Sequence, residues 1–254
     1  MYIWSICLLL LLAGASGYML GQFPYALVFA VALCAAIEVL IRRYYLKHAK
    51  LQVPFSGIIT GLIRGSVAPI GVPLLPILIA CVVAVFSKFF VKVKSVNVFN
   101  PAALGLLVGL GIFSIGSSWW TTSTVNLLGM AVSMAVLLVV AAYEARRLVL
   151  AFSFIVTLVL FSVATSPPIS LANFEIALLS VNCFFAFLML TEPKTSPPKK
   201  RAQLAYGIYV ALVYALFVVL TAHSLFFAEV DIFLALLIGN LTYAIYRSRG
   251  QKIL

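Results

Sequence analysis

The stretch Pro54-Phe55-Ser56-Gly57-Ile58-Ile59-Thr60-Gly61-Leu62-Ile63-Arg64-Gly65 decides how the rest of this chain is interpreted. It is apolar and follows a helical pattern, but a helix over residues 55–66 rises only about 18 Å at about 1.5 Å per residue. The hydrocarbon core of a bilayer is about 30 Å thick. The stretch therefore predicts a half-helix, or a re-entrant segment, that ends inside a membrane.

The composition around this stretch predicts an all-α integral membrane protein. Of the 254 residues, 65% are hydrophobic and 9% are charged, whereas soluble domains are about half apolar and about a quarter charged. A soluble catalytic domain is therefore excluded, and residues 1–254 are expected to form one polytopic membrane domain. Ten segments are predicted: 2–20, 24–42, 55–66, 72–90, 99–115, 124–143, 147–164, 171–190, 203–222 and 230–246.

The net charge of +11 is explained by topology, so we expect no nucleic-acid partner. Every Lys and Arg except Arg64 follows an even-numbered segment, and Lys88 is counted in the group after segment four. Basic loops face the cytoplasm, which predicts a multi-pass protein of the plasma membrane with both termini cytoplasmic. The opposite loops are expected to carry Glu175, Glu229 and Asp231.

Two alternatives concern the organisation of the chain. Ala13-Gly14-Ala15 resembles a signal-peptide cleavage site, although no Lys or Arg precedes it. Counting segments on either side of residue 118 also gives halves 1–118 and 119–254 of opposite orientation, as in transporters with inverted repeats.

Arg64 marks the first candidate site, because a charge at membrane depth costs several kcal/mol unless it is paired or hydrated. An anionic partner such as a flavin phosphate, or isoalloxazine oxygens, would satisfy it. The alternative is that Arg64 extends to the outer interface. Gly57, Gly61 and Gly65 lie on one helix face, which admits either a flat ligand or another helix.

Two further stretches carry polar groups at predicted helix ends. In Asn97-Val98-Phe99-Asn100-Pro101-Ala102, Asn100 is placed to cap a helix that begins at Pro101, whose free N–H groups attract anionic or carbonyl oxygens. Thr191-Glu192-Pro193 ends segment eight, where Glu192 could form only a solvated ion pair with nearby lysines. Within the predicted spans Glu38 is the one carboxylate, and Arg42, one turn away, is its expected partner.

The four cysteines lie singly in apolar segments, so we expect packing roles and no metal site, the alternative being Fe–S ligation shared with a partner. Trp119 and Trp120 are expected to be interfacial anchors.

Taken together, these stretches resemble the NqrB/RnfD family, the membrane subunits of the sodium-pumping NADH:quinone reductase and of the Rnf electron-transport complex. The half-helix matches at Ser56, Gly57, Thr60 and Gly61, and Phe-Asn-Pro-Ala matches at residues 99–102. Phe-Phe-Ala-Phe, Thr-Asp-Pro and Thr-Ser-Pro match at residues 184–187, 191–193 and 195–197, with Glu192 in place of Asp. The matches run in family order from about residue 50 to residue 246.

The resemblance implies a channel-like bundle of about ten helices, similar to urea transporters, that positions flavins for electron transfer coupled to Na⁺ or H⁺ movement. The cofactor implied is FMN or riboflavin, bound without a covalent bond, and the partners are other membrane and soluble subunits of an Rnf/Nqr-like system. The chain would be a subunit of an oxidoreductase and not a complete enzyme. The implied cofactor-binding residues are Ser56, Gly57, Thr60, Arg64, Asn97, Phe99, Asn100, Pro101, Thr191 and Glu192.

Covalent FMN is implied only if Thr124 is the acceptor. The family motif for that bond is Ser-Gly-Ala-Thr, whereas residues 117–124 read Ser-Ser-Trp-Trp-Thr-Thr-Ser-Thr and lack the Gly. The loss of this motif favours an alternative function, a transporter or channel for a small solute or a vitamin such as riboflavin on the same fold. A scaffold that anchors a reductase module is a third interpretation.

Overall fold

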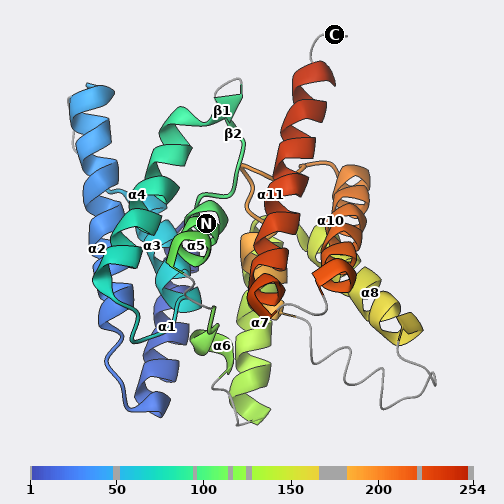
Figure 1. The fold of residues 1–254 in the computed structure, drawn as a ribbon, viewed down its shortest axis with the longest axis horizontal. Helices are drawn as coiled ribbons and strands as arrows, with labels where there is room; N and C mark the ends of the chain where they lie inside the picture. The colour runs from blue at the N-terminus through green and yellow to red at the C-terminus, as the bar shows by residue number, and fades with distance from the viewer. Residues whose placement is uncertain are drawn as a thin grey trace. The chain divides into compact units, whose positions relative to one another are not determined.

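A computed structural model describes residues 2–47, 52–93, 96–113, 117–123, 128–165, 182–221 and 225–250 of the chain, and most of these residues are helical (Figure 1). The elements in chain order are α1 (Tyr2–Leu20), α2 (Tyr25–Leu40), the π-helix η1 (Ile41–Tyr45), α3 (Phe55–Val67), α4 (Leu74–Phe90), β1 (Lys92–Val93), β2 (Val96–Asn97), α5 (Pro101–Phe113), α6 (Trp120–Ser123), α7 (Leu128–Glu144), α8 (Leu148–Thr165), the π-helix η2 (Phe185–Met189), α10 (Lys200–Thr221) and α11 (Leu225–Gly250).

The prediction of an all-α chain with membrane-compatible helices is confirmed in this part of the chain. Five helical stretches are long and apolar enough to cross a membrane, at Ile3–Leu20, Tyr25–Tyr45, Leu148–Thr165, Lys200–Thr221 and Val230–Arg249. Large apolar side chains are exposed along them, for example Leu11 on α1 and Leu160 on α8. Of the predicted segment 171–190, only the end that contains η2 lies within the described residues.

Three apolar helices in the first half of the described chain, α3, α4 and α5, are shorter than a full span, and α3 and α5 are the shortest of them. The predicted half-helix is α3, which has 13 residues. The described part of α5 also has 13 residues, fewer than the 17 of the predicted segment 99–115. Each helix is therefore about 20 Å long, and both are apolar but too short to count among the five spanning helices.

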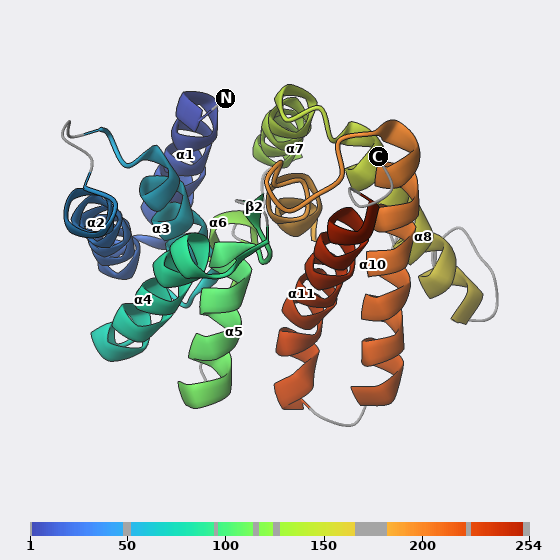
Figure 2. The same cartoon turned by 90° about the horizontal axis from the view of Figure 1, so that it is seen from above.

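The chain forms two compact units. Unit one contains Met1–Lys92 and Pro101–Met134, and unit two contains Val93–Asn100 and Ala135–Leu254. In unit one, α3 packs against α2, and α4 packs against α5 (Figure 2). In unit two, α10 packs against both α8 and α11.

Glycines determine how closely α3 approaches α2. A Cβ atom on Gly61 would lie 2.5 Å from the Cα of Val31, and one on Gly65 would lie 2.5 Å from the Cα of Leu27. A Cβ on Gly57 would lie 2.7 Å from the carbonyl oxygen of Cys34. The backbone of α2 therefore occupies the face on which these glycines lie, as in other small-residue helix contacts.

We predict that Gly61→Ala separates α3 from α2 and lowers the free energy of unfolding by about 1–3 kcal/mol, because the added methyl group overlaps the α2 backbone. Gly14→Ala is the matched control, since nothing lies within 4 Å of its added Cβ. This substitution should not destabilise the protein, because the higher helix propensity of alanine raises the free energy of unfolding by up to about 1 kcal/mol. Denaturant titration of the purified protein in micelles measures both. Equal effects of the two substitutions would contradict the packing of α3 on α2.

Candidate functional site

Arg64 lies in the last turn of α3 and is 3% exposed. Its Nε is buried without a hydrogen-bond partner, and both ion pairs found among the described residues belong to Glu38 and not to Arg64. The guanidinium is thus enclosed by unit one and does not extend to the protein surface, as the interface alternative required. It is a buried positive charge without a counter-charge in the described part of the chain.

A glycine of α5 makes room for this guanidinium. A Cβ atom on Gly109 would lie 3.3 Å from Arg64 Nη2, a contact tighter than an ordinary van der Waals contact. Two thiols that are fully buried, Cys34 on α2 and Cys81 on α4, lie near Arg64. The surroundings of Arg64 therefore contain thiols and backbone and no carboxylate among the described residues.

Residues 118–121 cap the C-terminal end of α3. Ser118 N donates to Val67 O over 2.9 Å, and Trp120 Nε1 donates to Gly65 O over 2.9 Å. Trp120 is 4% exposed, so its prediction as an interfacial anchor is wrong. The cap satisfies carbonyl groups that a helix leaves without donors, and the negative end of the helix dipole favours the nearby cation.

A buried ion-pair network lies one helical turn from Arg64. The carboxylate of Glu38, on α2, is fully buried and accepts from Arg42 Nη2 at 2.5 Å and from Lys88 Nζ at 2.9 Å. The predicted pair of Glu38 with Arg42 is confirmed. Lys88 was expected in a cytoplasmic basic group, but it lies inside α4 with a side chain that is 5% exposed.

Thr60 connects this network to α3. Lys88 Nζ lies 3.5 Å from Thr60 Oγ1, which in turn donates to Ser56 O over 2.8 Å. Ser56, Thr60 and Arg64 follow one another at intervals of four residues and so share a helix face. The single carboxylate of the network is shared by Arg42 and Lys88, so its charge is already balanced before Arg64 is considered.

In unit two, Asn100 of the Phe-Asn-Pro-Ala stretch contacts η2. Asn100 Nδ2 donates to Met189 O over 3.0 Å, where the carbonyl group of a helix end lacks a helical donor. Asn97 and Asn100 are buried, Phe99 is half-buried, and α5 begins at Pro101 as predicted. Two stretches that lie about 90 residues apart in sequence are therefore brought together.

The Thr191-Glu192 stretch forms a hydrogen-bonded turn directly after η2. Thr191 Oγ1 donates to Phe187 O over 2.5 Å. Ser196 Oγ donates to Glu192 O over 2.7 Å, and Thr195 Oγ1 donates to Glu192 Oε2 over 3.3 Å. Glu192 is half-buried, so this carboxylate is held by the turn and is not simply solvated.

The predicted site residues thus fall in two groups. Ser56, Gly57, Thr60, Arg64 and Pro101 lie in unit one; Asn97, Phe99, Asn100, Thr191 and Glu192 lie in unit two. Thr124 lies outside the described residues.

Asp231 is a candidate functional residue that the sequence analysis misplaced. It was expected in a loop, but α11 begins at Leu225 and includes Asp231, which is fully buried. Thr221 Oγ1 donates to its Oδ2 over 2.6 Å, and within the described chain Oδ1 has no partner. The apolar residues 225–227 before Asp231 could have indicated that the helix starts earlier. A carboxylate at this depth is a candidate functional group by default.

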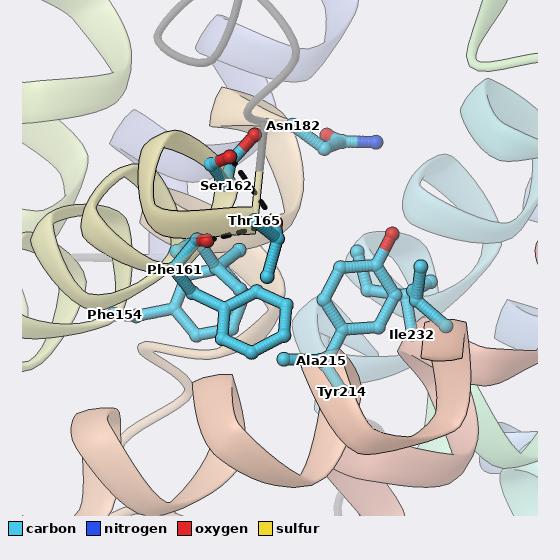
Figure 3. Close-up of a pocket in the computed structure, with 10 residues that line it drawn as sticks. Phe154, Phe161, Ser162, Thr165, Asn182, Tyr214, Ala215 and Ile232 are labelled. Atoms are coloured by element: carbon cyan, nitrogen blue, oxygen red, sulfur yellow. Dashed lines mark hydrogen bonds between the residues drawn. The ribbon is translucent and has the colours of Figure 1, made fainter. Parts of the chain in front are cut away.

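A cavity of about 250 Å³ lies between α8, α10 and α11 (Figure 3). Ile232, the residue directly after Asp231, is part of its lining. Phe154, Ala215 and Ile232 provide apolar walls, and the Tyr214 hydroxyl and the Asn182 amide add polar groups. Asn182 Oδ1 also accepts from Phe185 N over 2.9 Å at the start of η2. The cavity is therefore mostly apolar with a few polar groups, as small-molecule sites are.

No protein-family model matches the chain, and a comparison with curated proteins finds no match.

We predict that Glu38→Gln lowers the free energy of unfolding by about 3 kcal/mol or more, because it leaves Lys88 buried without its counter-charge. Glu144→Gln, at an exposed glutamate, is the matched control and should change stability by less than about 0.5 kcal/mol. The double variant Glu38→Gln/Lys88→Met should recover much of the loss in a double-mutant cycle. Additive losses would show that the two side chains do not interact.

Proposed function

We propose that this chain is a membrane subunit, similar to RnfD and NqrB, of a flavin-dependent electron-transfer complex. The observation that supports the proposal best is Arg64, a buried guanidinium for which the described residues provide no counter-charge, on a helix too short to span a bilayer. A buried charge is strongly unfavourable unless it is paired. A bound anionic group, or the carbonyl oxygens of a ring, would provide the missing partner.

The unsatisfied donor of Arg64 supports such a group. Its Nε is an orphaned buried donor, and a guanidinium offers five N–H donors in a planar fork. FMN or riboflavin, held without a covalent bond, would present phosphate or ring oxygens to these donors. A bound flavin supplies one- and two-electron transfer, and the protein supplies position and electrostatics.

The remaining elements of the proposal concern topology and partners. About ten membrane segments would place both termini and the basic loops in the cytoplasm of a plasma-membrane protein. The chain has no nucleotide-binding glycine fingerprint, so electrons would come from other membrane and soluble subunits. If electron transfer is coupled to Na⁺ or H⁺, Asp231 is the carboxylate of unit two that is suited to the cation.

We predict that purified full-length protein, after incubation with FMN or riboflavin, retains a flavin absorbance spectrum through gel filtration. Arg64→Gln should reduce retention about tenfold or more, because a charge-assisted hydrogen bond contributes about 1.5–3 kcal/mol. Arg43→Gln removes the same charge from an exposed position of η1 and serves as the control. In-gel fluorescence after denaturation reports a covalent bond separately.

Thermal unfolding without flavin distinguishes loss of a ligand contact from misfolding. Arg64→Gln should not lower the unfolding temperature of the flavin-free protein, because the charge that it removes has no ion-pair partner among the described residues. Equal flavin retention by wild type and Arg64→Gln contradicts the assignment of Arg64. A colourless protein that carries riboflavin or another small solute across vesicles without an electron donor contradicts the redox function and supports the transporter alternative.

A further inference from the structure

A second cavity in unit two lies where α7 ends and where α8 and α10 begin. It measures about 510 Å³ and is lined by Tyr143, Glu144, Arg146, Leu148, Val149, Lys200 and Gln203. Neither the predicted site residues nor Asp231 contribute to it. The cavity has a charged end, formed by the loop and the start of α10, and an apolar wall at the start of α8.

The loop at this cavity is held in an unfavourable backbone conformation. Arg146 has a φ of 56°, a left-handed conformation that costs a non-glycine residue about 1–2 kcal/mol. Gln203, which is 1% exposed, donates from Nε2 to Arg146 O over 2.9 Å, and Arg147 Nη1 donates to the same oxygen over 3.2 Å. The surrounding structure thus fixes the backbone from which the Arg146 side chain projects.

The charge balance of the cavity favours an anion. Arg146 and Lys200 line it together with one carboxylate, Glu144. Behind the loop, Arg147 is buried and its Nε donates to Ser196 Oγ over 3.1 Å; burial lowers the pKa of its guanidinium, which nevertheless stays charged. The N-terminal ends of α8 and α10 add positive potential from their helix dipoles.

An apolar track leads away from the cavity along α8. Val149 lines the cavity, and Phe152, Val156 and Leu160 follow at intervals of three or four residues. Their exposed fractions are 47%, 53% and 63%. Side chains at this spacing form one stripe on a helix surface. A ligand with an anionic head in the cavity can therefore lay an apolar chain along the exposed face of α8.

We propose that this cavity binds the phosphate diester of an anionic phospholipid, with Arg146 and Lys200 as its cationic partners. The acyl chains lie on the α8 stripe, and Glu144 accepts a hydrogen bond from a hydroxyl or ammonium of the headgroup. Basic pockets between membrane helices are suited to such headgroups. A soluble organic phosphate has the same phosphate chemistry, but it has no acyl chain that could contact the apolar stripe on α8.

The test is a titration of the purified full-length protein in neutral detergent, followed by native mass spectrometry. The probes are phosphatidylglycerol, phosphatidylcholine and sn-glycerol 3-phosphate. Phosphatidylglycerol should bind about tenfold or more tightly than phosphatidylcholine, because its phosphate charge is not balanced within the lipid. Weak binding of glycerol phosphate is expected; equal affinity of glycerol phosphate and phosphatidylglycerol would overturn the assignment to a lipid.

The variant Arg146→Asn/Lys200→Gln should weaken phosphatidylglycerol binding about tenfold or more. Asn is chosen at position 146 because it tolerates the left-handed conformation. The control Lys199→Gln/Arg201→Gln removes two charges from neighbouring exposed positions that do not line the cavity, and it should change binding less than about twofold in 0.15 M salt. Equal losses in both variants would overturn the proposal, as would unchanged binding in the first.

Lys200→Arg separates a charge effect from misfolding, because it keeps the cation and should retain phosphatidylglycerol binding within about threefold. Loss of binding in Lys200→Arg at an unchanged gel-filtration volume would also count against the proposal.

Discussion

The packing of unit one encloses the Arg64 guanidinium among apolar helices, and the residues that the structure describes supply no counter-charge to it. Arg64 is buried by the packing of unit one. Among the described residues no carboxylate pairs with it, and none forms a hydrogen bond with its Nε. Removing a charge from water costs several kcal/mol even after relaxation. The C-terminal dipole of α3 offsets only about 0.3–1 kcal/mol of that cost. The flavin that we propose would supply an oxygen partner for this cation.

The neighbouring network shows what a satisfied buried charge looks like in the same unit. Glu38 and Lys88 are as deeply buried as Arg64, but each contacts an opposite charge, and Thr60 adds a hydroxyl. The glycine face of α3 allows α2 to approach closely enough to bring Glu38 against this helix, since a Cβ on Gly57 would lie 3.0 Å from Glu38 Oε2. Close packing of α2 and α3 and the pairing of Glu38 with Lys88 therefore depend on each other. Arg64 lies one helical turn beyond Thr60 on α3.

Sequence patterns predicted the helices well, because apolar runs with polar breaks are local signals. They also predicted the pair of Glu38 and Arg42, whose spacing of four residues places both on one helix face. They could not predict Lys88 as the second partner of Glu38, since that contact joins residues 50 positions apart and depends on how α4 packs. Because Lys88 is close in sequence to Lys92 and Lys94, it was counted with these basic residues of a cytoplasmic loop.

Two other residues were misplaced for related reasons. Asp231 was assigned to a loop together with Glu229, although the predicted segment 230–246 already includes it; α11 starts at Leu225, and Asp231 is fully buried within it. Trp120 was assigned to the membrane interface on residue type, but its Nε1 donor is used by a carbonyl of α3. Arg64, by contrast, was found from sequence because a charge inside an apolar run is itself the signal.

An experimental density map of the protein purified with FMN or riboflavin would show directly whether Arg64 holds a flavin. We predict non-protein density within hydrogen-bond distance, about 3 Å, of the Arg64 guanidinium. A map in which Arg64 contacts a carboxylate of the chain itself, or in which side chains fill the space around the guanidinium and leave no bound group, would contradict it.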